Sequence, residues 1–203
     1  MKNTKGRIGE LDSIRGIAAI LVVLFHYVTL FRPILNYQFS KKIDFNLGRY
    51  GVQLFFIISG FVIFMSLNKI TNIKDFAIKR FIRLYPTYWL CLTITLFFIS
   101  LIKHPHLTFT TKEKLINLLM FQNLFNVKNI DGSYWSLVPE LLFYIQMGII
   151  YKLGLINKIR YVLFIWLILI FFSALKPSIL DIYLNLRYGM YFIAGICFYR
   201  IKN

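Results

Sequence analysis

The chain has 203 residues, of which 58% are hydrophobic, and its 24 Lys and Arg against 8 Asp and Glu give a net charge of +16. Since a membrane-spanning helix uses roughly 20 apolar residues, the apolar content suffices for at most about six such helices. With 16% charged residues and two cysteines that both lie inside apolar runs, Cys91 and Cys197, the chain fits neither a soluble enzyme, nor a disulfide-stabilised secreted domain, nor a disordered basic tail.

Six apolar segments follow one another along the chain. They cover residues 14–31, 50–67, 84–102, 136–156, 161–175 and 182–199. Each is continuous rather than alternating in hydropathy, which is typical of membrane helices and not of an outer-membrane barrel. A shorter run, 115–127, is expected to lie in the membrane interface or to re-enter. Residues 1–203 are therefore predicted to form a single all-α domain, a polytopic membrane helix bundle of about six transmembrane helices.

The basic residues lie between the apolar segments rather than on one face or in one tail. This distribution is typical of membrane-protein loops and argues against nucleic-acid binding. The segment 68–83 alone contains five Lys and Arg. Because cytoplasmic loops carry the excess of positive charge, this segment is predicted to face the cytosol, which places the N-terminus in the cytoplasm as well.

The first segment contains two basic residues, Arg15 and His26, and a cation within a membrane span costs roughly 3 kcal/mol. Eleven helical steps of about 100° bring them to the same face, about 16 Å apart along the axis. Arg15 is expected near the cytosolic edge and His26 beyond the midplane. They are candidates for a functional pair. The alternative is that Arg15 snorkels to the interface and His26 makes a helix-packing hydrogen bond.

Two further patterns lie on either side of the next loop. Ser59 and Gly60 fall near mid-membrane, where small residues allow another helix or a ligand to approach the backbone, and helix packing is the favoured interpretation from these residues alone. Arg80 and Arg83, at i and i+3, share a helix face at the cytosolic interface. They are suited to bidentate phosphate binding, and anchoring to lipid head groups is an equal alternative.

The fourth segment opens with Trp135, an interfacial anchor, and reaches Glu140 about five residues deep from the outer side. This depth matches that of His26, so the two are predicted to form an acid–base pair in which the carboxylate orients the imidazole. The alternative is that Glu140 pairs with a structural cation. Arg187 lies in the last segment without a clear partner. No metal site is predicted, since His104-Pro-His106 lacks a third ligand.

Taken together, these motifs resemble the acyltransferase-3 family of integral membrane O-acyltransferases. The resemblance rests on Leu11-Asp12-Ser13-Ile14-Arg15-Gly16, on Arg15 and His26 with ten residues between them, on Gly51–Phe61 ending in Ser59-Gly60-Phe61, on Arg80-x-x-Arg83 followed by Tyr85-Pro86, and on Trp135-Ser136-Leu137-x-x-Glu140. It runs from Leu11 to about Tyr144, with Ser13 where the family usually has Gly.

The resemblance implies a co-substrate, acetyl-CoA or another acyl-CoA, bound on the cytosolic side, a carbohydrate acceptor reached from the other face, and no permanently bound cofactor. Arg15 and His26 match the pair regarded as essential in the family, and Arg80 and Arg83 match its cytosolic arginine motif. Three further elements match motifs assigned to the substrate site. They are Ser59-Gly60-Phe61, Trp135 and Ser136.

The predicted function is therefore membrane transfer of an acyl group, expected to be acetyl, to a hydroxyl of a cell-surface or exported carbohydrate. The expected location is the bacterial cytoplasmic membrane. Family members typically have about ten spans, so this chain is expected to be a truncated form, a fragment or half of a split protein, with further helices or a partner subunit elsewhere. The alternatives are a transporter or flippase of a lipid-linked sugar, with His26 and Glu140 as a proton relay, and an inactive remnant.

Overall fold

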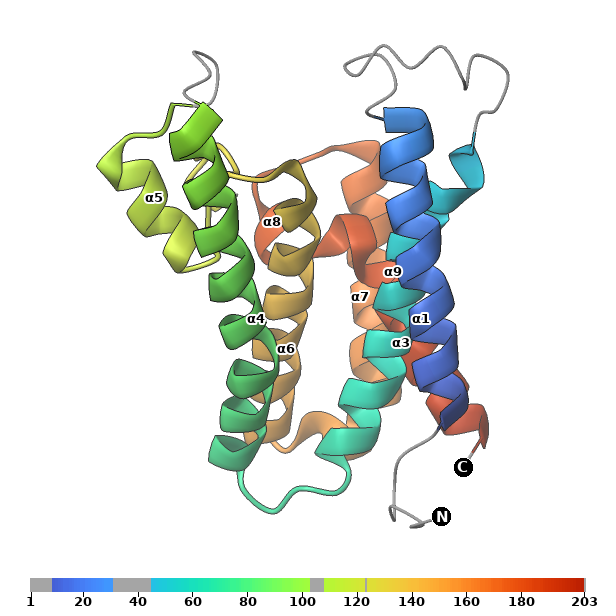
Figure 1. The fold of residues 1–203 in the computed structure, drawn as a ribbon. Helices are drawn as coiled ribbons and strands as arrows, with labels where there is room; N and C mark the ends of the chain where they lie inside the picture. Colours follow the sequence, from blue (N-terminus) through green and yellow to red (C-terminus); the bar gives the residue numbers. More distant parts are fainter. Residues whose placement is uncertain (1–8, 31–44, 103–107, 123, 203) are drawn as a thin grey trace. The chain divides into compact units, whose positions relative to one another are not determined.

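The computed structural model describes residues 9–30, 45–102, 108–122 and 124–202, and these contain helices and turns but no strand. Figure 1 shows the helices in chain order. The α-helices are α1 (Gly9–Leu24), α3 (Tyr50–Leu67), α4 (Ile73–Ile102), α5 (Thr111–Leu118), α6 (Leu137–Lys152), α7 (Ile159–Leu175), α8 (Leu180–Tyr183) and α9 (Leu186–Lys202). The shorter turns are the π-helical η1 (Phe25–Leu30) and the 3₁₀ turns η3 (Asn46–Arg49), η5 (Gly132–Ser136) and η6 (Leu155–Lys158).

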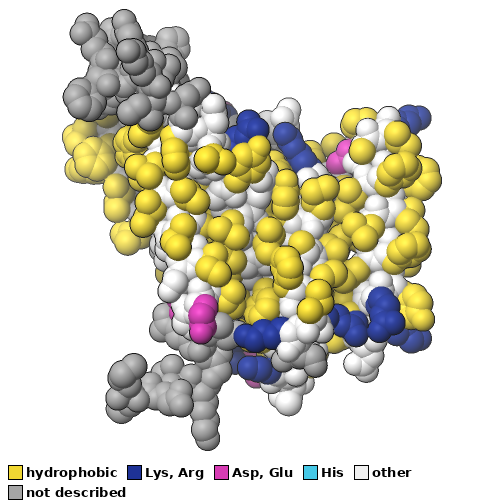
Figure 2. Space-filling view, turned by 90° about the vertical axis from the view of Figure 1, so that its right-hand side faces the viewer, with side chains coloured by type: hydrophobic (Ala, Val, Ile, Leu, Met, Phe, Trp, Pro, Cys, Tyr) yellow, Lys and Arg dark blue, Asp and Glu magenta, His cyan; other side chains and the backbone are white. Residues whose placement is uncertain are grey.

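The helical class of a multi-pass membrane protein is confirmed. Within the part of the chain that the structure describes, four stretches are long and apolar enough to cross a bilayer, namely Gly9–Thr29, Asn46–Leu67, Ile73–Ile102 and Leu155–Leu175. On the face drawn in Figure 2, hydrophobic side chains cover the middle of the helices, and Lys and Arg gather near their ends. The count of six spans and the cytoplasmic N-terminus stay predictions, since α6 and α9 have 16 and 17 residues. His104 and His106 lie outside the described residues.

Helix α4 differs from the sequence prediction, which began it at residue 84. The helix begins at Ile73, where the Asn72 side chain accepts a hydrogen bond from the Lys74 N–H and Asp75 lies in the first turn. Both features stabilise a helix N-terminus. Most of the basic segment 68–83 is therefore helical. Arg80 and Arg83 therefore lie on a regular helix, as their i, i+3 spacing predicted.

The chain divides into two compact units, each described by itself. Unit 1 comprises the described residues up to Val62 together with those from Tyr191 onward, and unit 2 comprises Ile63–Met190. In unit 1, the helices meet through glycines. A Cβ at Gly60 of α3 would overlap the backbone of Phe192 on α9, and a Cβ at Gly195 would overlap the carbonyl of Ile57. Such contacts let two helix backbones approach closely.

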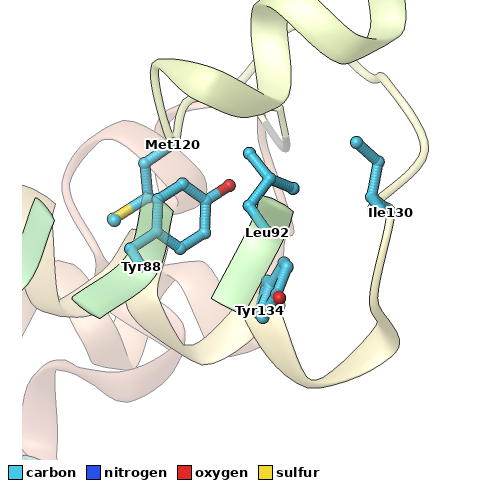
Figure 3. Packing of buried hydrophobic residues seen from close by; sticks show 5 residues of the cluster. All are labelled: Tyr88, Leu92, Met120, Ile130 and Tyr134. Atoms are coloured by element: carbon cyan, nitrogen blue, oxygen red, sulfur yellow. The ribbon is translucent and has the colours of Figure 1, made fainter. Parts of the chain in front are cut away.

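Unit 2 contains the α4–α6 pair, which lie side by side in Figure 1. A hydrophobic cluster forms where residues 117–134 return to α4 (Figure 3). Its buried members are Tyr88, Leu92, Met120, Ile130 and Tyr134. The rings of Tyr88 and Tyr134 meet edge to face with their centroids 5.1 Å apart. This cluster fixes the start of α6 against α4.

Helix α5 overlaps only the start of the run 115–127 that was predicted to lie in the interface or re-enter, and the membrane position of that run stays a prediction. Its N-terminus is closed by a capping box of Thr110 and Glu113. Its C-terminal carbonyls, which a helix leaves unpaired, accept hydrogen bonds from side chains of α4. Tyr88 donates to Asn117 over 2.5 Å, and Trp89 donates to Leu118 over 3.0 Å. These two hydrogen bonds hold the C-terminal end of α5 against α4.

Candidate active site

Arg15 and His26 lie on the stripe of α1 and η1 that faces α3 in unit 1. Ala18 and Val22 lie between them in sequence. The successive steps from residue 15 to 18, 22 and 26 are three, four and four residues, so all four residues lie on one side of the helix. Ala18 is fully buried, and a Cβ at Gly51 of α3 would lie 2.7 Å from both the Ala18 carbonyl oxygen and the Val22 side chain. Both candidates therefore flank a tight helix contact.

The two side chains of this stripe have different environments. The Arg15 guanidinium lies 3.9 Å from the Asp12 carboxylate, one turn earlier on the helix. The His26 ring places Nδ1 at 2.8 Å from the Val22 carbonyl oxygen. Because a carbonyl only accepts, Nδ1 carries the hydrogen in this arrangement, and the neutral ring then bears its lone pair on Nε2. A catalytic role for His26 stays a prediction.

The Ser59-Gly60-Phe61 motif has a packing environment in unit 1. Ser59 and Gly60 are buried, and Gly60 touches the α9 backbone at Phe192. The Phe61 ring meets the Tyr199 ring edge to face, with centroids 5.3 Å apart. These contacts agree with the helix-packing interpretation, and a role of this motif in shaping a substrate site stays a prediction.

In unit 2, Arg80 reaches from α4 toward the end of α3. Its Nη2 donates to the Ser66 hydroxyl over 2.6 Å, and its Cζ lies 5.3 Å from the Phe76 ring centre and 5.8 Å from that of Tyr144. Among the described residues, its buried Nε has no hydrogen-bond partner. The guanidinium lines a cavity of about 310 Å³ between α4 and α6. A donor without an acceptor beside a cavity is the arrangement that an anionic or carbonyl oxygen would complete.

Glu140 belongs to the same group of side chains. Its carboxylate accepts a short hydrogen bond from the Tyr144 hydroxyl, one turn later on α6, and it attracts Arg80 electrostatically. These contacts support the cation-partner alternative for Glu140. His26 lies in unit 1, so its pairing with Glu140 stays a prediction. Arg83 is exposed, but its charge interacts electrostatically with Arg80 and Tyr144. The two arginines therefore differ in burial, since Arg80 is half-buried.

Trp135 and Ser136 lie in η5, at the start of α6. The Ser136 hydroxyl donates to the Ser133 carbonyl over 3.2 Å, which caps the turn. The Trp135 ring packs at a tilt against Tyr188, with centroids 5.3 Å apart, beside a second and larger cavity. Arg187 was predicted inside the last span. It lies in the first turn of α9, which begins at Leu186, and whether this helix spans the membrane stays a prediction.

Three side chains of these sites were not predicted from the sequence. Tyr144 follows Glu140 by one helical turn, and this spacing was a visible signal. Ser66 and Tyr188 had no such signal, because each meets its partner only through the packing of distant elements.

Comparison with known proteins finds a family whose members resemble almost the whole chain. A model of the family described as an acyltransferase domain matches residues 8–203. ORF330 of Acidianus two-tailed virus, provisionally named an acetyltransferase, is 28% identical over 157 residues, which are 77% of this chain and 44% of that protein. The peptidoglycan O-acetyltransferase OatA of Listeria monocytogenes is 26% identical over 157 residues, 68% of this chain and 23% of that protein.

The O-acetyl transferase of Shigella phage Sf6 is 27% identical over 150 residues, 68% of this chain and 44% of that protein. The chain thus spans less than half the length of each of these relatives. No solved structure matches it.

Proposed function

The chain belongs to the acyltransferase-3 family, and we propose that it is a membrane O-acyltransferase that moves an acetyl group from acetyl-CoA to a hydroxyl of a cell-surface or exported carbohydrate. The observation that carries the proposal is the His26 ring, whose Nδ1 bonds the Val22 carbonyl so that Nε2 holds the lone pair. Relatives named O-acetyltransferases support the same reaction class. The proposed location is the bacterial cytoplasmic membrane, with the N-terminus in the cytoplasm.

Arg80 and Arg83 are the proposed binding residues for the anionic donor. Arginine forks match phosphate oxygens, and CoA carries several phosphate groups at one end. Ser66, Phe76 and Tyr144 hold the Arg80 guanidinium in one orientation, which lowers the entropy lost on binding. Arg83 is exposed and adds charge at the same helix end. Arg15 is proposed to add a third positive charge at the cytosolic edge.

The proposed chemical step is general-base catalysis by His26. Nε2 takes the proton of the acceptor hydroxyl as its oxygen bonds the thioester carbonyl carbon, and the carbon–sulfur bond then breaks. The imidazolium returns the proton to the departing thiolate, so that CoA leaves as the thiol. A transient acetyl-histidine is a compatible variant of the same route. Glu140 keeps its predicted role in orienting His26, while its contact with Tyr144 also supports a positioning role toward Arg80.

The test is acetyl transfer by the purified chain in detergent or vesicles, with radiolabelled acetyl-CoA and an oligosaccharide acceptor. His26→Ala is expected to lower kcat by roughly 10²–10⁴, the contribution of a general base. Arg80→Ala is expected to raise the KM for acetyl-CoA, while Arg49→Ala, an exposed arginine on η3, serves as the matched control. Full transfer by His26→Ala, or sugar movement that needs no CoA, contradicts the proposal.

A further inference from the structure

A second cavity, of about 970 Å³, lies within unit 2 among α6, α7, α8 and the first turn of α9. Its volume is at the upper end of the roughly 300–1,000 Å³ typical of small-molecule sites. Its lining combines aromatic rings, those of Trp135 and Tyr188, with the charged side chains of Asp181 and Arg187. It contains none of the residues that line the Arg80 cavity. The mixed lining distinguishes it from a surface that only packs against lipid.

The two cavities use different faces of α6. Val138, Pro139 and Leu142 line the larger one, whereas Leu141, Ile145 and Gly148 line the one beside Arg80. The larger cavity therefore lies toward the N-terminal end of α6, near Trp135, and the Arg80 cavity lies toward its C-terminal end. Two substrates that approach from opposite ends of the same helix would fit this arrangement.

The aromatic wall has a geometry suited to a flat, partly apolar ligand. The Trp135 and Tyr188 rings are tilted by 38° with centroids 5.3 Å apart, so they form an angled surface rather than a closed stack. The Arg187 guanidinium lies 5.6 Å from the centre of the Tyr188 ring. A ring with an apolar face and polar edges could pack on such a wall while its edges reach a charged donor.

The polar wall is held in place by hydrogen bonds. The Asp181 carboxylate accepts from the Ser178 N–H over 3.0 Å, and its pKa is held below the ordinary value by hydrogen bonds from Ser173 and Ser178. It is therefore ionised at neutral pH and accepts hydrogen bonds. Asn185, buried in the same wall, donates to the Pro139 carbonyl over 2.9 Å and so ties α9 to α6. One acidic and one basic side chain give this wall no net charge.

We propose that this cavity binds an uncharged sugar unit of the acceptor carbohydrate, with its apolar face on Trp135 and Tyr188 and its hydroxyls bonded to Asp181 and Arg187. The proposal rests on the proposed acyltransferase function. A carboxylate accepts from hydroxyl groups and a guanidinium donates to them, so the pair satisfies both sides of a hydroxyl's hydrogen bonding. The absence of net charge in the pair favours a neutral sugar over an anionic one.

Direct binding tests the cavity without requiring catalysis. Tri-N-acetylchitotriose and maltotriose are titrated into the purified chain, with tryptophan fluorescence as the readout because Trp135 lines the site. We expect saturable binding of at least one trisaccharide. Arg187→Ala, an exposed position that should not disturb folding, and Tyr188→Ala are each expected to weaken it about tenfold. Tyr183→Ala and Lys176→Ala, exposed and outside the cavity, are the matched controls.

A transfer assay then separates this proposal from the function on which it rests. Arg187→Ala is expected to raise the KM for the trisaccharide about tenfold with little change in kcat, whereas the controls keep the wild-type KM. Trisaccharide binding without any acetyl transfer would contradict the proposed function and leave the sugar site standing. Failure of wild-type chain to bind either sugar, or equal KM values for Arg187→Ala and Lys176→Ala, would overturn the sugar site.

Discussion

The two units hold their helices together by different means. In unit 1, Gly51, Gly60 and Gly195 bring α1, α3 and α9 into contact through their backbones. In unit 2, the side chains of Tyr88 and Trp89 join α4 to α5, and that of Asn117 joins α5 to the loop after it, through hydrogen bonds to backbone groups. The first kind of contact depends on the absence of a Cβ, and the second depends on particular polar atoms.

The two units therefore differ in the kind of substitution that disrupts them. A backbone contact fails when volume is added, since neither helix can move away without losing the rest of its packing. A hydrogen-bonded contact fails when an atom is removed, since a buried donor or acceptor then loses its partner. The candidate base, His26, and Arg15 belong to unit 1, whereas Arg80 and Arg83 belong to unit 2.

The largest expected effect is that of Gly195→Ala in unit 1. The added methyl would overlap the Ile57 carbonyl of α3, so we expect the free energy of unfolding to fall by more than about 4 kcal/mol and little folded protein to be recovered. Gly16→Ala is the control, because a Cβ built there has no atom within 4 Å apart from its own chain neighbours and helix backbone. Size-exclusion chromatography and thermal unfolding in detergent would measure both. Equal recovery of the two variants would refute the glycine-contact account of unit 1.

In unit 2, the corresponding test removes the side chain of Asn117. This fully buried amide donates to the carbonyls of Glu113 and Lys128 and accepts from the Ile130 N–H. Asn117→Ala removes the side-chain partner of the Lys128 carbonyl and of the Ile130 N–H, and we expect a loss of about 3 kcal/mol in unfolding free energy. Lys114→Ala, exposed on the same helix, should change it by less than about 0.5 kcal/mol. A stability loss in Asn117→Ala no larger than in Lys114→Ala would show that hydrogen bonds do not hold this region.

Much of the fold was predictable, because a continuous apolar run is a strong signal. The run 50–67 has the same bounds as α3, and 161–175 falls within α7. The first eleven residues of α4 were missed because Lys74 and Lys79 made them look like a loop. Their helix signal was the Asn72 cap followed by Asp75, which hydropathy does not register.

The candidate site was predictable only in its local parts. The shared face of Arg15 and His26 depends on helix period alone, and so does the Glu140–Tyr144 pair. The contact between Arg80 and Ser66 joins two helices across a turn, and that between Trp135 and Tyr188 joins residues 53 positions apart. Such contacts depend on tertiary packing, for which a single sequence carries no periodic signal.

A smaller effect is expected from Ser66→Ala at the candidate donor site in unit 2. The variant removes the acceptor for Arg80 Nη2 without adding volume. Because the bond is only partly buried, we expect a loss of about 1 kcal/mol in stability and a severalfold rise in the KM for acetyl-CoA. Ser100→Ala, exposed near the end of α4, is the control. An unchanged KM for acetyl-CoA would show that Ser66 does not position Arg80 for the donor.

The smallest effect concerns the capping box of α5 and its dependence on pH. Hydrogen bonds from the Thr110 N–H and hydroxyl lower the pKa of Glu113, so its ionised form is favoured in the folded chain. A carboxyl whose folded pKa is depressed contributes stability above its unfolded pKa, about 4.3, and loses that contribution as the pH falls through the folded pKa. Amide hydrogen exchange at α5 should therefore accelerate, relative to α7, on acidification below about pH 4. In Glu113→Gln, whose side chain does not titrate, that acid-dependent difference should disappear, and its persistence would assign the effect to another group.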